Sequence, residues 1–279
     1  MPIRNPRRLS KVGGKVTVDL SKDVTVWLIT CGEPTTADAR SALRNQNSSF
    51  LFGEITNEAP MSRAFQAMID HCETRFYVEV DADMILRADG VQALYSAMLQ
   101  AKAQNPKCAM VAMGLWDRHA ARPIIGCKIY DRRAFQDYPY RDVQGCETDQ
   151  LSRMKNDGWS YLLLFDGHAS QGHPCLVGEH VTANNPWQAF ERYRDLMVKH
   201  RKYKHSPWIE VLPKRLLEKI CEPSKSECKV DIDSPDLWAL IGFIVGVADP
   251  LARHKGEKDA RTYEKDEVYK NLRRLLGRE

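Results

Sequence analysis

Long apolar runs are missing from this 279-residue sequence. The longest uninterrupted one, from Leu237 to Ala248, falls well short of the roughly 20 apolar residues that a membrane-spanning helix needs. The first apolar run, "VTVWLIT", is also too short for a secretory signal, and the residues before it are charged. We therefore expect a cytoplasmic protein without a membrane span, with peripheral contact to a membrane left open.

Two motif classes are absent as well. The eight cysteines are scattered and none forms a CxxC pair, which predicts free thiols in a reducing compartment. The sequence contains no GxxxxGK[ST] phosphate loop, and this argues against a P-loop kinase or ATPase. It also shows no internal repeat and no long low-complexity tract.

Neither sign of charge dominates. Lysine and arginine number 41 against 37 aspartate and glutamate, a formal net charge of +4 that does not by itself indicate nucleic acid. The basic residues concentrate in "RNPRRLSK", "ERYRDLMVKHRKYKH" and "KNLRRLLGRE". Such runs are usually solvated faces, although a basic rim built from them would suit a phosphate-bearing acceptor, either a lipid-linked saccharide or nucleic acid.

What the chain does have is an alternation of strand and helix patterns from residue 23 onward. The runs "VTVWLIT", "FYVEV" and "CAMVAMG" are typical of buried strands. Between them lie two apolar stripes at helical spacing, one formed by Met61, Ala64, Phe65, Met68, Ile69 and Cys72, the other by Val91, Leu94, Ala97, Met98 and Ala101. This order predicts an α/β sandwich with a mostly parallel, Rossmann-like sheet.

The pattern continues to about residue 203 and then changes. "PIIGCKIYDRRAF" predicts a strand and turn, "TDQLSRMKNDGW" a short helix, "YLLLFD" a strand and "PWQAFERYRDLMVKH" a long helix. We expect a basic arm over 1–22, a catalytic-type domain over 23–203 and a mainly helical extension over 204–279. The apolar segment in that extension is interpreted as a core helix or a homodimer contact, with a membrane-interface helix as the alternative.

The strand in "TRFYVEVDADMILRADG" delivers two carboxylates, Asp81 and Asp83, to its own tip. Ligands of such sheets bind beyond the carboxyl ends of the strands, so the loop after Thr30 could face the same cleft. Two carboxylates this close repel one another, and Mg²⁺ or Mn²⁺ resolves that repulsion while also binding phosphate. The pair predicts a metal–diphosphate site, and an exposed turn at the strand end is the alternative.

These elements resemble a known family. "VWLITCGEPTT", "NEAPMSRAFQAMI" and "FYVEVDADMIL", followed by "IIGCKIYDRRAF" and "GCETDQLSRMKNDGW", are similar in order to the GT-A glycosyltransferases, particularly the large family-2 type. The resemblance covers about residues 23 to 200. It implies a metal-dependent, inverting transfer of a sugar from a nucleotide-diphosphate sugar, with a UDP-sugar as the first expectation, to an acceptor hydroxyl. The acceptor itself is open: a glycan, a lipid-linked saccharide or nucleic acid.

The resemblance also implies roles for residues at the donor site. Asp81 and Asp83 would hold the metal, Mn²⁺ or Mg²⁺, together with the diphosphate, and Asp83 would be the more direct ligand. Arg63 could meet the base or the diphosphate, or it could be a plain surface arginine. The base and ribose pocket would be lined by Thr30, Cys31, Gly32 and Glu33.

The acceptor side has two candidate bases. Asp149 would take the proton from the acceptor hydroxyl, and Glu147 is the runner-up. The family commonly shows an adjacent Glu–Asp pair, whereas a threonine separates the two acids here. Among three histidines after the strand "YLLLFD", His180 is the first candidate to complete a metal site. The others are His168 and His173.

Three further interpretations stay open. Trp116 and Asp117 could lie where an acceptor passes, although a tryptophan in a loop often only packs. A nucleotidyltransferase also combines an α/β sheet with Mg²⁺ and carboxylates, but "CGEPTTADAR" lacks the glycine-rich, basic phosphate loop of that class. A non-catalytic α/β protein that binds nucleic acid through its basic surface is the rival from another class.

Overall fold

The structure, a computed structural model, describes most of the chain in two compact units. The first unit comprises Met1–Arg118 with Arg122–Val181, and the second comprises His119–Ala121 with Thr182–Glu279. The domain boundary expected from the sequence, at residue 203, falls inside the second unit. The described residues are 3–9, 18–118, 121–143, 145–181, 185–200, 207–221, 231–249 and 265–275.

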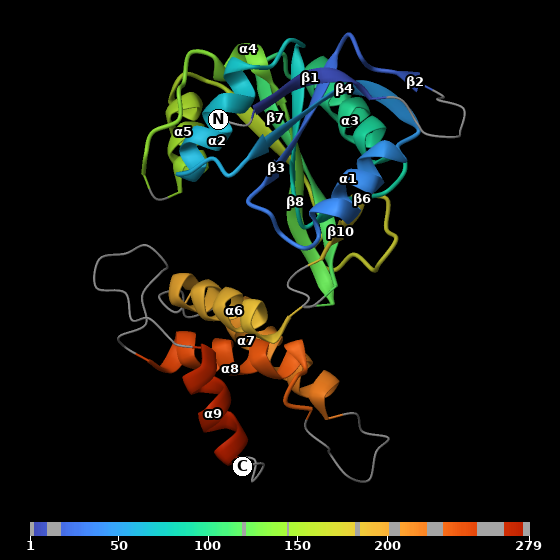
Figure 1. Cartoon of the computed structure of the whole chain (residues 1–279). Helices are drawn as coiled ribbons and strands as arrows, with labels where there is room; N and C mark the ends of the chain where they lie inside the picture. Colours follow the sequence, from blue (N-terminus) through green and yellow to red (C-terminus); the bar gives the residue numbers. More distant parts are fainter. Residues whose placement is uncertain are drawn as a thin grey trace. The chain divides into compact units, whose positions relative to one another are not determined.

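The first unit is built on a ten-stranded sheet with helices on both faces (Figure 1). The strand order is β1-β4-β3-β5-β8-β7-β10-β6, with β2 also paired to β4 and β9 to β7. The strands are β1 Ile3–Leu9, β2 Val18–Asp19, β3 Val24–Thr30, β4 Ser48–Thr56, β5 Phe76–Asp81, β6 Met84–Leu86, β7 Cys108–Asp117, β8 Arg122–Asp131, β9 Ser160–Leu164 and β10 Leu176–His180. This architecture confirms the predicted α/β sandwich.

The sheet is mostly parallel, with one reversal at its centre. β3 runs parallel to both β4 and β5, and β7 runs parallel to β9 and β10. β8 lies between these two sets and is antiparallel to β5 and to β7. Consequently β3, β5, β7 and β10 all point in one direction, and their carboxyl ends lie along the same edge of the sheet.

Five helices cover the two faces of this sheet. Beneath α1 and α3 lies a core that includes Leu43, Leu94 and Met98, and beneath α2, α4 and α5 lies a second core that includes Trp27 and Tyr77. The helices are α1 Thr36–Arg44, α2 Met61–Asp70, α3 Gly90–Gln104, α4 Arg132–Phe135 and α5 Cys146–Asn156.

The apolar patterns locate most of these elements. Every residue of β3 except Ile29 is buried, as the run "VTVWLIT" predicts for a strand covered on both faces. The stripe on α2 is buried apart from Met61, which is 63% exposed at the first turn. The sequence analysis assigned no element to residues 36–56, where the structure has α1 and β4. The start of the expected basic arm forms β1, which pairs antiparallel with β4.

The second unit is helical, and its core lies between α6 and α8. Trp238 and Phe190 pack edge to face, with ring centroids 6.2 Å apart. Gly242 permits the close approach of the two helices, because a Cβ there would lie 2.2 Å from the carbonyl oxygen of Phe190. The helices are α6 Pro186–His200, α7 Pro207–Ile220, α8 Pro235–Ala248 and α9 Lys265–Leu275.

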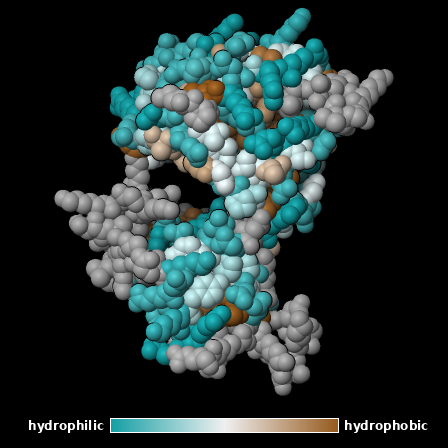
Figure 2. All heavy atoms as spheres, in the orientation of Figure 1, coloured by the Kyte–Doolittle hydropathy of each residue, from teal (hydrophilic) through white to brown (hydrophobic). Residues whose placement is uncertain are grey.

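The apolar segment at 237–248 is therefore part of a helix whose inner face is core, while Ile244 on its other side is 53% exposed. None of the described helices is long and apolar enough to span a bilayer. The face of the molecule in Figure 2 is largely hydrophilic, and its apolar side chains form small separate patches. The cysteines in the described part of the chain are free thiols, and Cys228 lies outside that part.

Candidate functional site

Polar side chains gather where the co-directional strands of the sheet end. β3 ends at Thr30 and β5 at Asp81, and these strands are neighbours, with Ile29 paired to Asp81. β7 ends at Asp117 and β10 at His180, which are themselves paired. This edge therefore carries the loop after β3, the two aspartates of the D-x-D sequence and a buried histidine, as expected for the ligand-binding edge of such a sheet.

Asp83, His180 and Asp117 form a hydrogen-bonded series across this edge. Nε2 of His180 lies 3.1 Å from Oδ2 of Asp83, and Nδ1 lies 2.9 Å from Oδ2 of Asp117. The backbone N–H of Val181 donates to the carbonyl oxygen of Asp83 at 2.7 Å, which fixes the turn against β10. His180 and Asp117 are buried, so the contact orients the imidazole with Nε2 toward Asp83.

This arrangement bears on two of the sequence predictions. Of the three histidines, His180 is the one that the structure brings to the D-x-D turn. His168 and His173 lie on the loop between β9 and β10, where His173 contacts the thiol of Cys175 at 3.0 Å. Asp117, considered from sequence as an acceptor contact, is buried against His180 instead.

Asp81 lies among other carboxylates. Burial, and after it the nearby charges of Glu79 and Asp83, raise the pKa of Asp81 to about 8 against the opposing charge of Lys128. Burial likewise raises the pKa of Glu79. Among the residues that the structure describes, none makes a hydrogen bond or ion pair with the Asp81 side chain. Because its pKa is raised in this way, the carboxyl of Asp81 keeps its proton up to about pH 8 in the free protein.

A buried network lies beneath Asp81 on the same face of the sheet. Lys128 of β8 lies with Nζ 2.7 Å from Oε1 of Glu147 and 3.6 Å from Oε2 of Glu79. The hydroxyl of Tyr130 is 2.5 Å from Glu79 Oε2 and 3.2 Å from Glu147 Oε1. Burial acts to lower the pKa of Lys128, but the two glutamates outweigh it and raise that pKa.

The two candidate bases differ in their surroundings. Both lie in the first turn of α5, where the helix dipole favours acids. Glu147 faces the buried network through Lys128 and Tyr130. Asp149 instead contacts Arg153 at 3.0 Å, one turn along the helix, and Arg141 at 3.8 Å.

The loop after β3 is closed by its own hydrogen bonds. The hydroxyl of Thr30 and the backbone N–H of Cys31 both donate to Oε2 of Glu33, each at 2.8 Å. The N–H of Gly32 donates to Oγ1 of Thr30, and the φ of +89° at this glycine lets the chain turn there. The four predicted pocket residues therefore form one compact turn beside Asp81.

Arg63 is not drawn into this arrangement. Its guanidinium pairs with Glu58 at 2.7 Å, and its side chain is 55% exposed. Within the described residues no contact joins Arg63 to the D-x-D turn, so the surface interpretation of this arginine fits its position in the structure.

Glu79, Lys128 and Tyr130 were not among the residues predicted from the sequence. A signal was present: Tyr77, Glu79 and Asp81 recur at every second position of an otherwise apolar strand, and alternate residues of a strand share one face. Lys128 and Tyr130 repeat the pattern on β8, and register pairs Lys128 with Glu79. What the sequence could not supply was that β5 and β8 are neighbours.

The residues at this edge suit a divalent cation that also takes ligands from elsewhere. Asp83 offers carboxylate oxygen and His180 offers imidazole nitrogen, which are ligand types of Mn²⁺. Over the described ranges, no group of three or more His, Cys, Asp and Glu side chains is arranged to hold a metal unaided. Mg²⁺ and Mn²⁺ often bind through one or two carboxylates and complete their shell with water and substrate phosphates, so the donor set fits that mode.

No protein-family model and no curated protein matches the sequence. Solved structures that resemble the chain include the mannosyltransferase PcManGT from Pyrobaculum calidifontis in complex with GDP-Man and Mn²⁺, at 11% identity and a TM-score of 0.45, over 95% of this chain and 83% of that one. Another is TarS 1-349 from S. aureus in complex with UDP-GlcNAc, at 13% identity and a TM-score of 0.36, over 81% of each chain.

A third is 4-diphosphocytidyl-2C-methyl-D-erythritol synthase from Anaerococcus prevotii, at 7% identity and a TM-score of 0.38, over 58% of this chain and 94% of that one. At such identities and scores, the likeness says nothing about the substrates of this chain.

Proposed function

We propose that this protein is a metal-dependent glycosyltransferase of GT-A type, which moves a sugar from a nucleotide-diphosphate sugar to an acceptor hydroxyl. The observation that carries the proposal is the grouping of acids at the carboxyl edge of the sheet, where Asp83 contacts a histidine held by Asp117 and the partly buried Asp81 lies beside them. Ionising Asp81, whose pKa is raised to about 8, is unfavourable in the free protein, and a cation bound with a diphosphate would compensate the carboxylate charge.

Each part of the edge has a role in this proposal. Asp83 and His180 would hold Mn²⁺ or Mg²⁺, with Asp81 beside them. The turn made by Thr30, Cys31, Gly32 and Glu33 would receive the nucleoside, because it lies one strand away from Asp81 on the same edge. A bound metal ion would neutralise the charge that develops on the leaving diphosphate.

The chain's own acid–base chemistry takes place on α5. One of the two acids in its first turn would accept the proton of the acceptor hydroxyl as that oxygen attacks the anomeric carbon.

The test is a panel of nucleotide sugars, each with Mn²⁺, Mg²⁺ or a chelator. We expect one donor to raise the melting temperature only with metal present and to be hydrolysed slowly to the nucleoside diphosphate and free sugar. Asp83→Asn should abolish the thermal shift and lower hydrolysis by about 10²-fold or more, because it removes a direct ligand. Asp89→Asn, an exposed aspartate a few residues further on, is the matched control and should behave as the unchanged protein.

The products separate this activity from its closest enzymatic rival. A nucleotidyltransferase would consume a nucleoside triphosphate with a sugar phosphate and release pyrophosphate. Pyrophosphate release from such a pair, with no donor hydrolysis, would overturn the proposal in favour of nucleotidyl transfer. Absence of any metal-dependent shift across the panel would overturn it altogether.

A further inference from the structure

Two acids lie two residues apart in the first turn of α5, and the structure gives them opposite surroundings. Glu147 is directed toward the buried polar network on β5 and β8, and Asp149 toward a pair of arginines. A general base must present a carboxylate oxygen that the protein does not already occupy. The contacts of each oxygen therefore distinguish the two acids.

Both oxygens of Asp149 face guanidinium groups. Oδ2 accepts from Nε of Arg153 at 3.0 Å, and Oδ1 lies 3.8 Å from Nη1 of Arg141. Arg153 also donates to the carbonyl oxygen of Pro139 at 2.7 Å, so it connects α5 to the preceding loop. These contacts give Asp149 a structural task, which is to fasten the start of α5.

Only one oxygen of Glu147 is engaged by the described residues. Oε1 accepts from Nζ of Lys128 at 2.7 Å and lies 3.2 Å from the hydroxyl of Tyr130. Its side chain remains 31% exposed. With Oε1 anchored, Oε2 is available to a hydroxyl that approaches from the exposed side.

The two anchoring residues are themselves held rigidly. Lys128 and Tyr130 share a face of β8, and their strand is paired with β5 through the Tyr77–Tyr130 and Glu79–Lys128 positions. The rings of Tyr130 and Tyr77 stack with centroids 4.7 Å apart, and Phe135 meets Tyr130 edge to face at 5.0 Å. Side chains fixed in this way define the place of the carboxylate better than a loop would.

The network also has hydrogen-bonding capacity that the described protein atoms do not use. The hydroxyls of Tyr77 and Tyr140 are buried and have no partner in the described part of the chain. Burial raises the pKa of both phenols, and the charge of Glu147 is a further cause for each. Buried hydroxyls of this kind are normally satisfied, so a water or a hydroxyl-bearing ligand is the expected partner.

We infer that Glu147 is the base that deprotonates the acceptor, and that Lys128 and Tyr130 are positioning residues that hold its carboxylate. The acceptor proton passes to Oε2 of Glu147 as the acceptor oxygen bonds to the anomeric carbon. The bond between that carbon and the diphosphate oxygen breaks, and its electron pair leaves with the nucleoside diphosphate. This inference rests on the proposed glycosyl transfer.

The experiment compares variants of the full chain in donor affinity and in the turnover of slow donor hydrolysis, where water is the acceptor. Glu147→Gln should lower kcat by about 10²-fold or more and leave the donor Kd within about threefold, since the base acts on the acceptor only. Asp149→Asn should also lower kcat, but the fold-loss should be at least about ten times smaller than the fold-loss caused by Glu147→Gln. Equal losses, or a larger loss in Asp149→Asn, would overturn the inference.

Positioning is tested by a conservative series. Tyr130→Phe removes one hydrogen bond and should lower kcat about fivefold at unchanged donor Kd. Lys128→Met should lower kcat by at least about tenfold, and Lys128→Arg should recover part of that loss because it restores a cation. Lys155→Met, at an exposed lysine of the same helix, is the matched control and should leave kcat unchanged. Thermal melts identify any variant that fails to fold, and Tyr130→Phe decides the question if Lys128→Met does.

The outcomes separate this inference from the proposal beneath it. If the unchanged protein neither binds nor hydrolyses any donor, glycosyl transfer fails and the assignment of Glu147 fails with it. If the unchanged protein hydrolyses a donor and Glu147→Gln retains its kcat, only the assignment of the base fails.

Discussion

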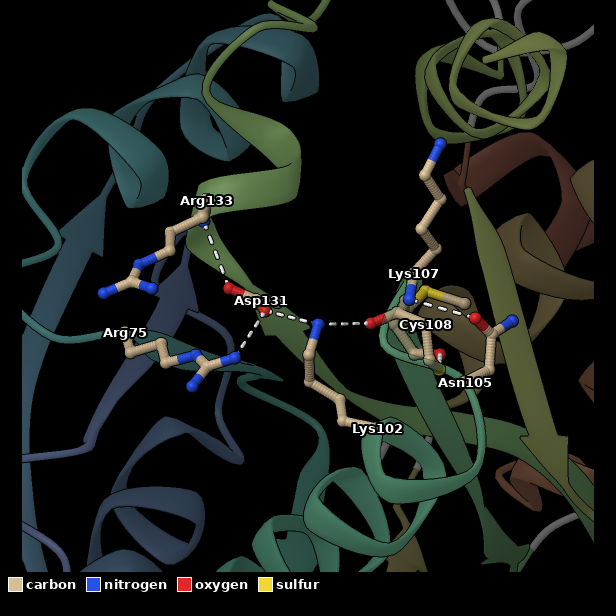
Figure 3. A network of polar contacts seen from close by, with 8 residues as sticks. Arg75, Lys102, Asn105, Lys107, Cys108, Asp131 and Arg133 are labelled. Atoms are coloured by element: carbon tan, nitrogen blue, oxygen red, sulfur yellow. Dashed lines mark hydrogen bonds and ion pairs between the residues drawn. The ribbon is translucent and has the colours of Figure 1, made fainter. Parts of the chain in front are cut away.

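The acids at the two ends of strand β5 have different charged neighbours. At its amino end, Phe76 pairs with Asp131 of β8, and this aspartate is surrounded by positive charge (Figure 3). At its carboxyl end, burial and the nearby charges of Glu79, Asp83 and Glu147 raise the pKa of Asp81 against the opposing charge of Lys128. The same pair of strands therefore carries one aspartate with cationic partners and another, Asp81, with no hydrogen bond or ion pair to the described residues.

Asp131 shows what a structural carboxylate looks like in this fold. Its Oδ2 lies 2.6 Å from Nζ of Lys102 and 3.4 Å from Nη2 of Arg75, and Oδ1 accepts from the N–H of Arg133 at 3.3 Å. Lys102 donates as well to the carbonyl oxygen of Cys108 at 3.0 Å (Figure 3). These contacts join α3, α4 and β8, so the charge of Asp131 is matched within the protein.

The contrast supports the proposed binding of a cation at the carboxyl edge. Asp131 is surrounded by hydrogen-bond donors of the same protein. At the carboxyl edge the fold instead concentrates acids and leaves the pKa of Asp81 raised to about 8. Ionising this carboxyl is unfavourable in the free protein and becomes favourable when a cation binds.

The largest effect should come from a substitution of Asp131, at the amino end of β5. Asp131→Asn would leave Lys102 buried without its partner, and we expect a loss of about 3 kcal/mol in the free energy of unfolding. Urea denaturation followed by circular dichroism measures it. Asp89→Asn, in an exposed pair with Arg87, should change stability by less than about 0.5 kcal/mol. Equal effects in the two variants would remove the distinction between the two ends of β5.

The next effect concerns the proposed metal ligands at the carboxyl edge. Asp117→Asn keeps the shape of the side chain but weakens the contact that orients His180. We expect the affinity for Mn²⁺ in the presence of donor to fall by about 10–100-fold, with the fold retained. Electron paramagnetic resonance of free Mn²⁺ provides the titration. An unchanged affinity would mean that His180 is not a ligand.

The smallest effect is a change in how stability depends on pH. Because the pKa of Asp81 is raised from 3.8 to about 8 in the folded protein, the folded state binds this proton more tightly than the unfolded state does. Its contribution to stability is therefore full below about pH 4 and is lost as pH rises through about 8. Asp81→Asn removes the titrating group. Between pH 5 and pH 9, the free energy of unfolding of the variant should therefore rise by about 1 kcal/mol or more relative to that of the unchanged protein.

Thermal or urea unfolding in the presence of a chelator, at several pH values, checks this prediction. Chelator is needed because a bound cation would stabilise the charged carboxylate and mask the trend. If the stability of the two proteins changes with pH in the same way, the pKa of Asp81 is not raised in the folded state. The comparison between the two ends of β5 would then lose its main support.

Several strands and helices could be predicted from the sequence patterns, and others could not. The buried runs located β3, β5 and β7, and the apolar stripes located α2 and α3, because burial against a sheet imposes a local periodicity. The D-x-D sequence at the end of β5 was visible for the same reason. α1 and β4 were overlooked, and so was the exposure of Met61 at the start of α2.

The site residues divide in the same way. Asp81, Asp83 and the loop at 30–33 follow from strand ends, and a strand end is a local feature of the chain. The partnership of Asp117 with His180 depends on the pairing of β7 with β10, whose residues are 63 positions apart. The network of Lys128 depends equally on the pairing of β5 with β8.

By itself, then, the sequence determined the α/β class, the order of most elements and the place where two acids leave a strand, since each is written in neighbouring residues. The tertiary structure alone decided which partner each buried acid has. The physical reason is that charge compensation acts through space over a few ångströms. Only strand order and register bring Lys102 to Asp131, Lys128 to Glu147 and His180 to Asp83.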